Sequence, residues 1–96
     1  MRLNFLFFLL IFVTLNAVAM PKIMVKHQRN AENFAEIQII NETTKALVCS
    51  IAIDGYKIKL KLAAKAYSKW YKATDQRFNY KHFRVWCDYA TLHPNF

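Results

Sequence analysis

The sequence predicts a mainly β protein, built as a small antiparallel sheet or sandwich with one core disulfide. Three observations lead to this prediction. Several short segments alternate apolar and polar side chains, which is the period of a half-buried strand. Asp54-Gly55 separates two of these segments and favours a tight β-hairpin. Cys49 and Cys87 each fall on an apolar face of such a segment. A helix at about 62–73, and with it an α+β fold, stays open as the alternative.

Composition narrows the class further. The chain has 96 residues, of which 55% are hydrophobic and 16% aromatic, so one folded domain is expected rather than a disordered tail. One glycine and two prolines exclude collagen, Gly-rich phosphate loops and Pro-rich spacers. Lys and Arg outnumber Asp and Glu by 14 to 6, a formal net charge of +8. The protein is therefore basic, and an anionic partner is expected.

Residues 1–19 are predicted to be a secretory signal peptide. Arg2 precedes an unbroken apolar run from Phe5 to Val13, and Ala17-Val18-Ala19 supplies the small side chains that a signal peptidase needs. Cleavage after Ala19 would release a secreted or periplasmic protein. The alternative is an uncleaved membrane anchor, but two asparagines interrupt the apolar span.

Removal of this leader would leave 77 residues with 13 basic and 6 acidic side chains, a net charge of +7. Domains of this size bury only about 60% of their unfolded surface and often need a covalent staple. An exported protein meets an oxidising compartment, so Cys49 and Cys87 are expected to pair rather than remain as two buried thiols. Closing the loop between them would stabilise the fold by roughly 3 to 4 kcal/mol.

The mature chain begins with 20–33, which is predicted to be a basic flexible arm with room for a short strand at Ile23 to Val25. A single small β domain is expected to span 34–96. Its first strand is Phe34 to Ile40, in which alternate isoleucines share one face.

The strongest local pattern is a hairpin between Ala46 to Ile53 and Tyr56 to Leu62. A two-residue turn at Asp54-Gly55 sets its register and separates an apolar face from a basic one. The facing pairs on the apolar side are Ile53–Tyr56, Ile51–Ile58, Cys49–Leu60 and Leu47–Leu62. The other side carries Lys57, Lys59 and Lys61 opposite Ala52, Ser50 and Val48.

Residues 62–73 fit two patterns. As a helix, they place lysines on one side and alanine and aromatic side chains on the other. As extended chain, they turn at Ala64-Lys65 and form a strand from Tyr67 to Tyr71, because tyrosine and tryptophan favour sheets. The strand is the prediction, and the helix is its alternative.

The last predicted strand is Asn79 to Ala90. Its apolar face carries Cys87, so the two cysteines would join different strands across the core, while Trp86 lies on the opposite face. Pro94 prevents further pairing in the short tail that follows.

The layout of these elements resembles secreted plant self-incompatibility-type domains. The resemblance lies in the spacing of Cys49, Asp54-Gly55, an aromatic strand and Phe83-Arg84-Val85-Trp86-Cys87, and it covers about 47–89. Such domains are small disulfide-bonded β-sandwiches that act as extracellular ligands, so the resemblance implies the all-β interpretation of 62–73. The chain departs from them in cysteine number and total length.

The candidate anion-binding site is the row Lys57, Lys59 and Lys61. Alternate side chains of a strand project from one face about 6.8 Å apart, and the lysines of 62–73 would continue the positive run. Such a row can bind a polyanion by releasing counterions. The expected partner is an anionic surface (phospholipid, lipopolysaccharide, wall polymer or acidic glycan) or an acidic protein, with nucleic acid less expected. The alternative is a solvated face that only keeps the protein soluble.

Other chemistry has weaker support. Trp86 faces away from Cys87 and is the best candidate for an aromatic contact beside the lysines. The three histidines share no catalytic or metal-ligand motif. They are His27, His82 and His93. A metal site built from His82, Cys87 and Asp88 would lose its thiolate to the disulfide. We therefore expect no enzyme activity, no metal and no cofactor.

These observations predict a small exported cationic binding protein that is not an enzyme. The alternative is a secreted, membrane-active cationic effector or toxin, in which aromatic side chains insert while lysines hold anionic headgroups. Asn41-Glu42-Thr43 is an N-glycosylation sequon in a predicted turn, and the sequence leaves its use open.

Overall fold

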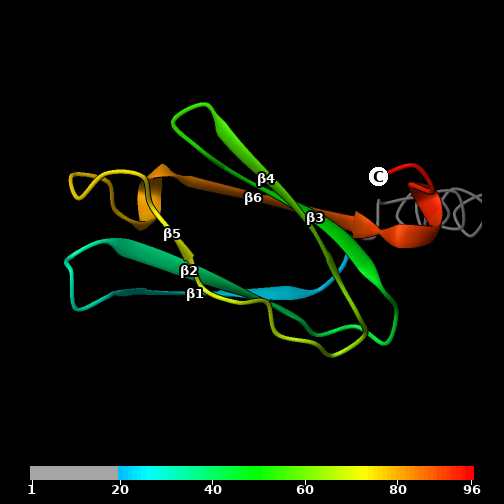
Figure 1. Ribbon diagram of the computed structural model, residues 1–96. Helices are drawn as coiled ribbons and strands as arrows, with labels where there is room; N and C mark the ends of the chain where they lie inside the picture. The colour runs from blue at the N-terminus through cyan, green and yellow to red at the C-terminus, as the bar shows by residue number, and fades with distance from the viewer. Residues whose placement is uncertain (1–19) are drawn as a thin grey trace, which may run out of the picture.

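The computed structural model describes residues 20–96, and the predicted signal peptide lies outside them. These residues fold as two antiparallel three-stranded sheets that face each other (Figure 1), which confirms the mainly β prediction. No helix within 20–96 is long and apolar enough to cross a membrane. The strands are β1 (Ile23–Arg29), β2 (Ala35–Asn41), β3 (Leu47–Ile53), β4 (Tyr56–Leu62), β5 (Tyr71–Lys72) and β6 (Phe83–Tyr89).

The first sheet has the strand order β1-β2-β5, with β2 in the centre. Strand β1 pairs with β2 along all seven of its residues, from Ile23 opposite Asn41 to Arg29 opposite Ala35. The structure thus differs from the prediction of a flexible arm over 20–33. Pairing with β1 satisfies the backbone N–H and C=O groups along one side of β2, and it gives the alternate apolar side chains of β1 a core to pack against.

The second sheet has the order β4-β3-β6, so that β3 is central and β4 and β6 are its edges. The hairpin register matches the prediction at every pair of β3 with β4. Asp54 and Gly55 form the turn with φ angles of 47° and 81°, the left-handed backbone that a type I′ turn requires at both central positions. The turn and the apolar alternation demand the same register, which is why the sequence specifies it.

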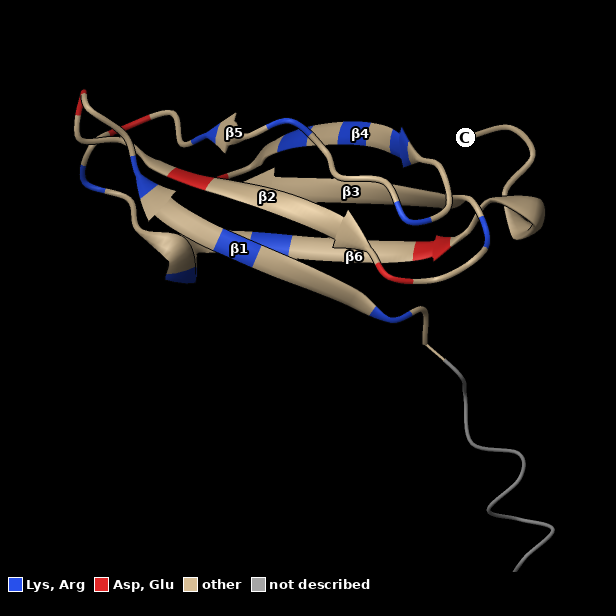
Figure 2. Ribbon diagram, turned by 90° about the horizontal axis from the view of Figure 1, so that it is seen from below, with Lys and Arg blue, Asp and Glu red and all other residues tan. Residues whose placement is uncertain are grey.

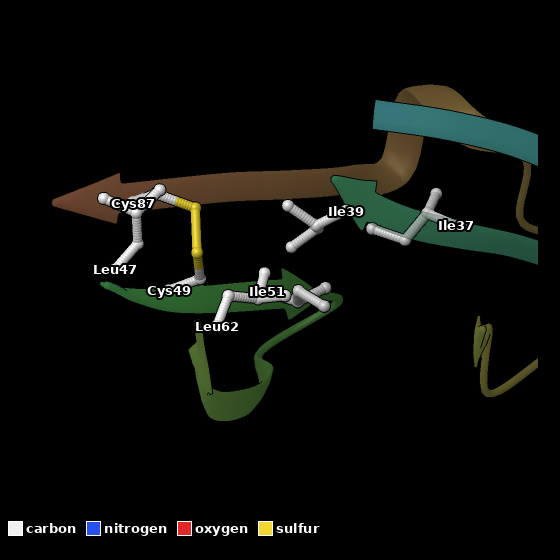
Figure 3. Close-up of a cluster of buried hydrophobic side chains, with 7 residues drawn as sticks. All are labelled: Ile37, Ile39, Leu47, Cys49, Ile51, Leu62 and Cys87. Carbon is white, nitrogen blue, oxygen red and sulfur yellow. A yellow bond between two sulfur atoms is a disulfide. The ribbon is translucent and has the colours of Figure 1, made fainter. Parts of the chain in front are cut away.

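The core lies between the two sheets (Figure 3). Ile37 and Ile39 of β2 pack in one cluster with Leu47 and Ile51 of β3, and all four side chains are at most 1% exposed. Leu62 at the end of β4 joins the same cluster. Burial of each such side chain contributes roughly 1.5 to 3 kcal/mol, so this cluster is the main source of stability.

The disulfide joins two neighbouring strands of one sheet. Cys49 of β3 lies directly opposite Cys87 of β6, with a Cα–Cα distance of 4.0 Å, and both belong to the buried cluster (Figure 3). The predicted pairing is confirmed. The expectation that the bridge spans the core is wrong, because both cysteines come from the same sheet. Alternation shows which face a cysteine occupies, but it does not show which strands are neighbours.

The segment after β4 is extended, so its helix alternative is wrong and its turn at Ala64-Lys65 is confirmed. The chain then crosses to the first sheet, where a single bridge joins Tyr67 to β2 and only β5 pairs further. The expected strand from Tyr67 to Tyr71 is therefore interrupted. Its interruption begins at Ser68, whose buried hydroxyl accepts the Ile39 N–H in place of a backbone carbonyl.

The last strand is shorter than predicted. It begins at Phe83 rather than Asn79, because Tyr80–His82 form a single 3-10 turn, η1. Asn79 caps this turn: its side chain accepts a backbone N–H of the turn, and its own N–H donates to His82 Nδ1. A second 3-10 turn, η2 (Ala90–Leu92), begins the C-terminal tail.

Asn41, the first residue of the sequon, is a buried structural side chain. It is 0% exposed at the end of β2. Its Nδ2 donates to the carbonyls of Lys45 and Ala63 at 2.8 and 2.9 Å, and its Oδ1 accepts from the N–H and the hydroxyl of Thr43. These bonds tie the β2–β3 loop to the residues that follow β4. The fold therefore leaves no free amide at this position for a glycan.

Candidate anion-binding face

The predicted lysine row lies on the outward side of the second sheet. Lys57, Lys59 and Lys61 are exposed positions of the edge strand β4 (Figure 2). Their register partners on β3 are Ala52, Ser50 and Val48, in that order. Cys49 and Ile51 occupy the opposite, core-facing side of β3. The lysines therefore take no part in the packed interior.

Strand β6 supplies the other side of this surface. In its register with β3, Arg84 lies opposite Ala52, Trp86 opposite Ser50 and Asp88 opposite Val48. Three columns of side chains thus run side by side, with long basic ones on β4, small ones on β3 and a mixed set on β6. Neighbouring strands lie about 4.8 Å apart, so about 10 Å separates the backbones of the two outer columns. We call the column of small side chains on β3 the central strip.

Arg84 was not among the predicted site residues. Its position on the same face as Trp86 follows from the alternation of the last strand, so that part was readable from the sequence. The pairing of β6 with β3, which brings Arg84 across from Lys57, could not be predicted from the sequence. An arginine is always charged and offers a planar fork of donors that binds carboxylate, phosphate or sulfate at two points. We therefore group Lys57, Lys59, Lys61, Arg84 and Trp86 as the cationic face.

The four cations of this face have no carboxylate partner within residues 20–96. The ion pairs in that range are Lys72–Glu32, Arg77–Asp75 and His93–Asp88. None of them includes a basic residue of β4 or β6. The face consequently presents four positive charges that the described chain does not neutralise, on a surface that packing does not require.

Asp88 is the acidic residue at one end of the same side of the sheet. Its Oδ2 lies 2.8 Å from Nε2 of His93, and its Oδ1 accepts the Tyr89 N–H at 2.8 Å. A carboxylate only accepts hydrogen bonds, so the histidine ring is the donor. These two hydrogen bonds hold the pKa of Asp88 below its usual range, and the bond from His93 has a larger effect than the bond from the Tyr89 backbone. This carboxylate is thus engaged with the tail rather than with the lysines.

The C-terminal tail folds back over the Asp88 end of the sheet (Figure 2). Trp86 meets the His93 ring edge-on, with ring centroids 5.4 Å apart, and Phe96 packs against His93. The Phe96 ring also lies 5.4 Å from the Nζ of Lys59. Val48 at this end is only 1% exposed although it faces outward. The tail thus covers part of this side of the sheet, and the open part of the central strip lies toward the hairpin turn.

The lysines after β4 do not continue the row, so that prediction is wrong. The chain crosses to the first sheet, and Lys65, Lys69 and Lys72 follow it there. Lys65 Nζ donates to the Glu42 carbonyl at 2.8 Å, and Lys72 Nζ lies 4.0 Å from a carboxylate oxygen of Glu32. The positive charge of the cationic face therefore depends on β4 and β6 alone.

Trp86 lies on the side away from Cys87, as predicted, and is 42% exposed. It is the only aromatic residue among the outward positions of β3, β4 and β6. Tyr67 is also exposed, but it pairs with the first sheet, and Tyr71 packs against the core. Trp86 is therefore the one aromatic side chain that the three strands themselves place beside the lysine row, and the tail adds Phe96.

The histidines are separated by the fold into different roles. His27 of β1 stacks on Tyr80 with ring centroids 4.8 Å apart, whereas His82 caps η1 and His93 binds Asp88. Within residues 20–96, no group of three His, Cys, Asp or Glu side chains is arranged to hold a metal ion.

One hollow lies beside β1, and another lies between Phe96 and the β4 residues Lys59, Leu60 and Lys61. His27, Arg29 and Tyr80 are among the residues that line the first. Arg29 donates from Nη1 to the Asn33 carbonyl at 2.6 Å and from Nη2 to the Phe78 carbonyl at 2.9 Å. Its guanidinium thus clamps two loops to β1 and has fewer donors left for a ligand than Arg84 has.

Comparison with models of known protein families, with curated proteins and with solved structures finds no match to this chain. The fold and the surface define it physically as a small disulfide-bonded β-sandwich with a cationic outer face. Its function has to be argued from that face, because a sandwich fold by itself implies none.

Proposed function

We propose that this chain is an exported, non-enzymatic binding protein that recognises an anionic surface or an acidic partner through the cationic face. The observation that carries the proposal is the set of four cations without carboxylate partners on one side of one sheet. Cations gathered in this way attract polyanions, and binding is strengthened by the release of counterions.

Export is part of the proposal. The Cys49–Cys87 disulfide supports it, since such bonds persist in oxidising compartments. The apolar run and small residues of 1–19 add the sequence pattern of a signal peptide. The intact mass of the exported protein should then correspond to a chain that begins at Met20. A product that stays in the membrane and retains Met1 would contradict this part.

The binding test compares two triple variants of equal charge. In the first, Lys57, Lys59 and Lys61 are each replaced by Gln. The matched control replaces three exposed lysines elsewhere by Gln: Lys22, Lys26 and Lys81. Affinity for heparin and for anionic vesicles is measured at several salt concentrations. We expect the first variant to bind more weakly and with a shallower salt dependence, because fewer counterions are released, while the control changes less.

The free energy of unfolding of both variants should lie within about 0.5 kcal/mol of the parent value, because all six lysines are exposed. If the two variants bind alike, the net charge of the whole protein attracts the anion, and the lysine row is only a solvated face. If neither heparin nor vesicles bind the parent protein, the proposal itself fails.

A membrane-active effector is the second candidate, favoured by the exposed Trp86, which lies in the same row of the sheet as Lys59 with Ser50 between them. An indole can enter a bilayer interface while neighbouring lysines hold anionic headgroups. Dye-loaded anionic vesicles separate the two candidates. A binding protein leaves them sealed, whereas an effector releases the dye.

A further inference from the structure

We propose that the cationic face binds a linear acidic polysaccharide, which lies along the central strip with one sugar ring stacked on Trp86. This inference rests on the proposed function and names the class of ligand for the same surface. It is carried by three features of the second sheet: the arrangement of charge, the place of the single indole, and the end that the tail closes.

Positive charge flanks the strip on both sides at the hairpin end. Lys57 and Arg84 are both register partners of Ala52, one on each neighbouring strand. From Lys57 to Lys61 the row extends for about 14 Å along β4. A small anion would use one or two of these groups, whereas an extended chain with repeated negative groups can use Lys57, Lys59 and Arg84, the three cations toward the open hairpin end. The pattern therefore fits a linear polyanion that runs parallel to the strands.

The indole selects among linear polyanions. Trp86 lies across the strip from Lys59, with Ser50 between them. A sugar ring that carries a carboxylate or a sulfate has an apolar face for the indole and a negative group for the lysine. The hydroxyl of Ser50 is of the kind that bonds to sugar hydroxyls. A ring of this chemistry matches all three side chains of the row at once.

Two other ligands fit less well. Proteins that bind single-stranded nucleic acid stack successive bases on several free aromatic side chains, whereas the outward strand positions here offer one, and the tail rings of His93 and Phe96 pack against each other. A bilayer is flat and would meet the tips of the lysines without reaching the strip. Both remain outcomes of the experiment.

The tail places the indole and closes one end of the strip. The His93 ring meets Trp86 at an interplanar angle of 87° and is itself held by the Asp88 carboxylate. Phe96 packs on His93 and lies against Lys59. The indole is thus supported on one side, and its exposed part is the part available to a ligand. The bound chain should therefore enter from the hairpin end, where Arg84 stands.

The test uses the oxidised protein recovered from expression of the full chain, with Trp70 replaced by Phe so that Trp86 is the only tryptophan. Size-defined heparin fragments, a single-stranded DNA oligomer and anionic vesicles are titrated at two salt concentrations. We expect heparin fragments to shift the Trp86 emission and to bind tighter than DNA or vesicles. Affinity should rise with fragment length until the chain covers the open part of β4 from Lys57 to Lys59, about 7 Å.

Two variants localise the contact, and their affinities are measured by isothermal titration calorimetry, because Trp86→Leu removes the emission signal. Trp86→Leu should weaken heparin binding by roughly three- to tenfold with an unchanged salt dependence, because a stacking contact carries no charge. Arg84→Gln should weaken binding and lower the salt slope by about one counterion. Tyr67→Leu, which removes an exposed aromatic ring from the other sheet, is the control and should bind like the parent. Thermal unfolding shows whether each variant is folded.

The outcomes separate this inference from the proposed function. If heparin binds with a clear salt dependence but Trp86→Leu and Arg84→Gln bind like the parent, the strip is not the site and only the broader proposal stands. If DNA or vesicles bind tighter than heparin, the ligand class is wrong. If no anion binds, the proposed function is wrong, and so is the inference that rests on it.

Discussion

Cys49 and Cys87 lie directly opposite each other on neighbouring strands, so their disulfide fastens the central strand β3 to the edge strand β6 inside one sheet. The residues next to Cys87 on β6, Trp86 and Asp88, point to the other side of the sheet. The bond therefore holds one wall of the cationic face in register with the central strip. This relationship links the stability of the fold to the geometry of the surface.

The first prediction concerns this bond. The oxidised protein should have a mass about 2 Da below the reduced form, from the two protons lost. Replacing both cysteines by Ala should lower the free energy of unfolding by roughly 2 to 5 kcal/mol, because the unfolded chain regains its freedom. Chemical denaturation of the parent and the double variant gives the difference. Two alkylatable thiols in the denatured, unreduced parent would contradict the pairing.

The second prediction concerns Asn41. Asn41→Ala removes the donor to two loop carbonyls and the acceptor for Thr43, all at a buried position, and should destabilise the fold by roughly 2 to 4 kcal/mol. Asn95→Ala, at an exposed position in the tail, is the control and should change little.

The same burial makes a prediction about modification. Protein folded after expression in a eukaryotic secretory pathway should carry no glycan at Asn41, because Nδ2 is fully engaged. Its mass should not change on enzymatic deglycosylation. Folded protein that loses mass in this treatment would show that the Asn41 contacts are not required.

The third prediction concerns acid. Hydrogen bonds from Arg77 lower the pKa of Asp75 from 3.8 to about 2. The Arg77 side chain donates to both carboxylate oxygens and has the largest effect, and the Arg77 backbone N–H has the next largest. A carboxyl group whose pKa is lowered in the folded state adds stability above its ordinary pKa, and this stability is lost as the pH falls through the folded value. For Asp75 the window is therefore between about pH 4 and pH 2. Asp88, with its lowered pKa, acts in the same direction.

Thermal unfolding measured across this window checks the assignment. The melting temperature of the parent should fall more steeply from pH 4 to pH 2 than that of Asp75→Asn or Asp88→Asn. Arg77→Gln should flatten the curve in part, since it removes the side-chain donors and keeps the backbone N–H. The contribution of Asp75 should be small, because its pair with Arg77 lies at the surface. Parallel curves for parent and variants would refute the role of both carboxylates.

The fourth prediction concerns the hairpin turn. Gly55 has a φ of 81° and open space where a Cβ would be, so Gly55→Ala should be destabilising by about 1 to 2 kcal/mol through backbone strain alone. Asp54→Asn should be nearly neutral, because asparagine tolerates the left-handed backbone. Equilibrium unfolding of the two variants tests this. A loss as large for Asp54→Asn as for Gly55→Ala would mean that the turn is not of type I′.

The sequence by itself determined the local parts of this protein. The register of β3 with β4 followed from Asp54-Gly55 and from alternation, since both act over a few residues. The same alternation placed Cys49 and Cys87 inward and Trp86 outward. For residues 62–73 the sequence correctly predicted an extended chain with a turn at Ala64-Lys65. The interruption of the strand that follows depends on the contact of Ser68 with β2, which no local pattern encodes.

The tertiary structure decided which segments became neighbours. The order β4-β3-β6 turned the disulfide into a bond within one sheet and brought Arg84 across from Lys57. The pairing of β1 with β2 made a strand of an expected arm, and the tail brought Phe96 to Lys59. Each of these contacts joins residues distant in the chain. They form because the backbone groups of a strand edge need hydrogen-bond partners and an apolar face needs to be buried. The periodicity of a segment shows that it needs a partner but does not show which segment that partner is.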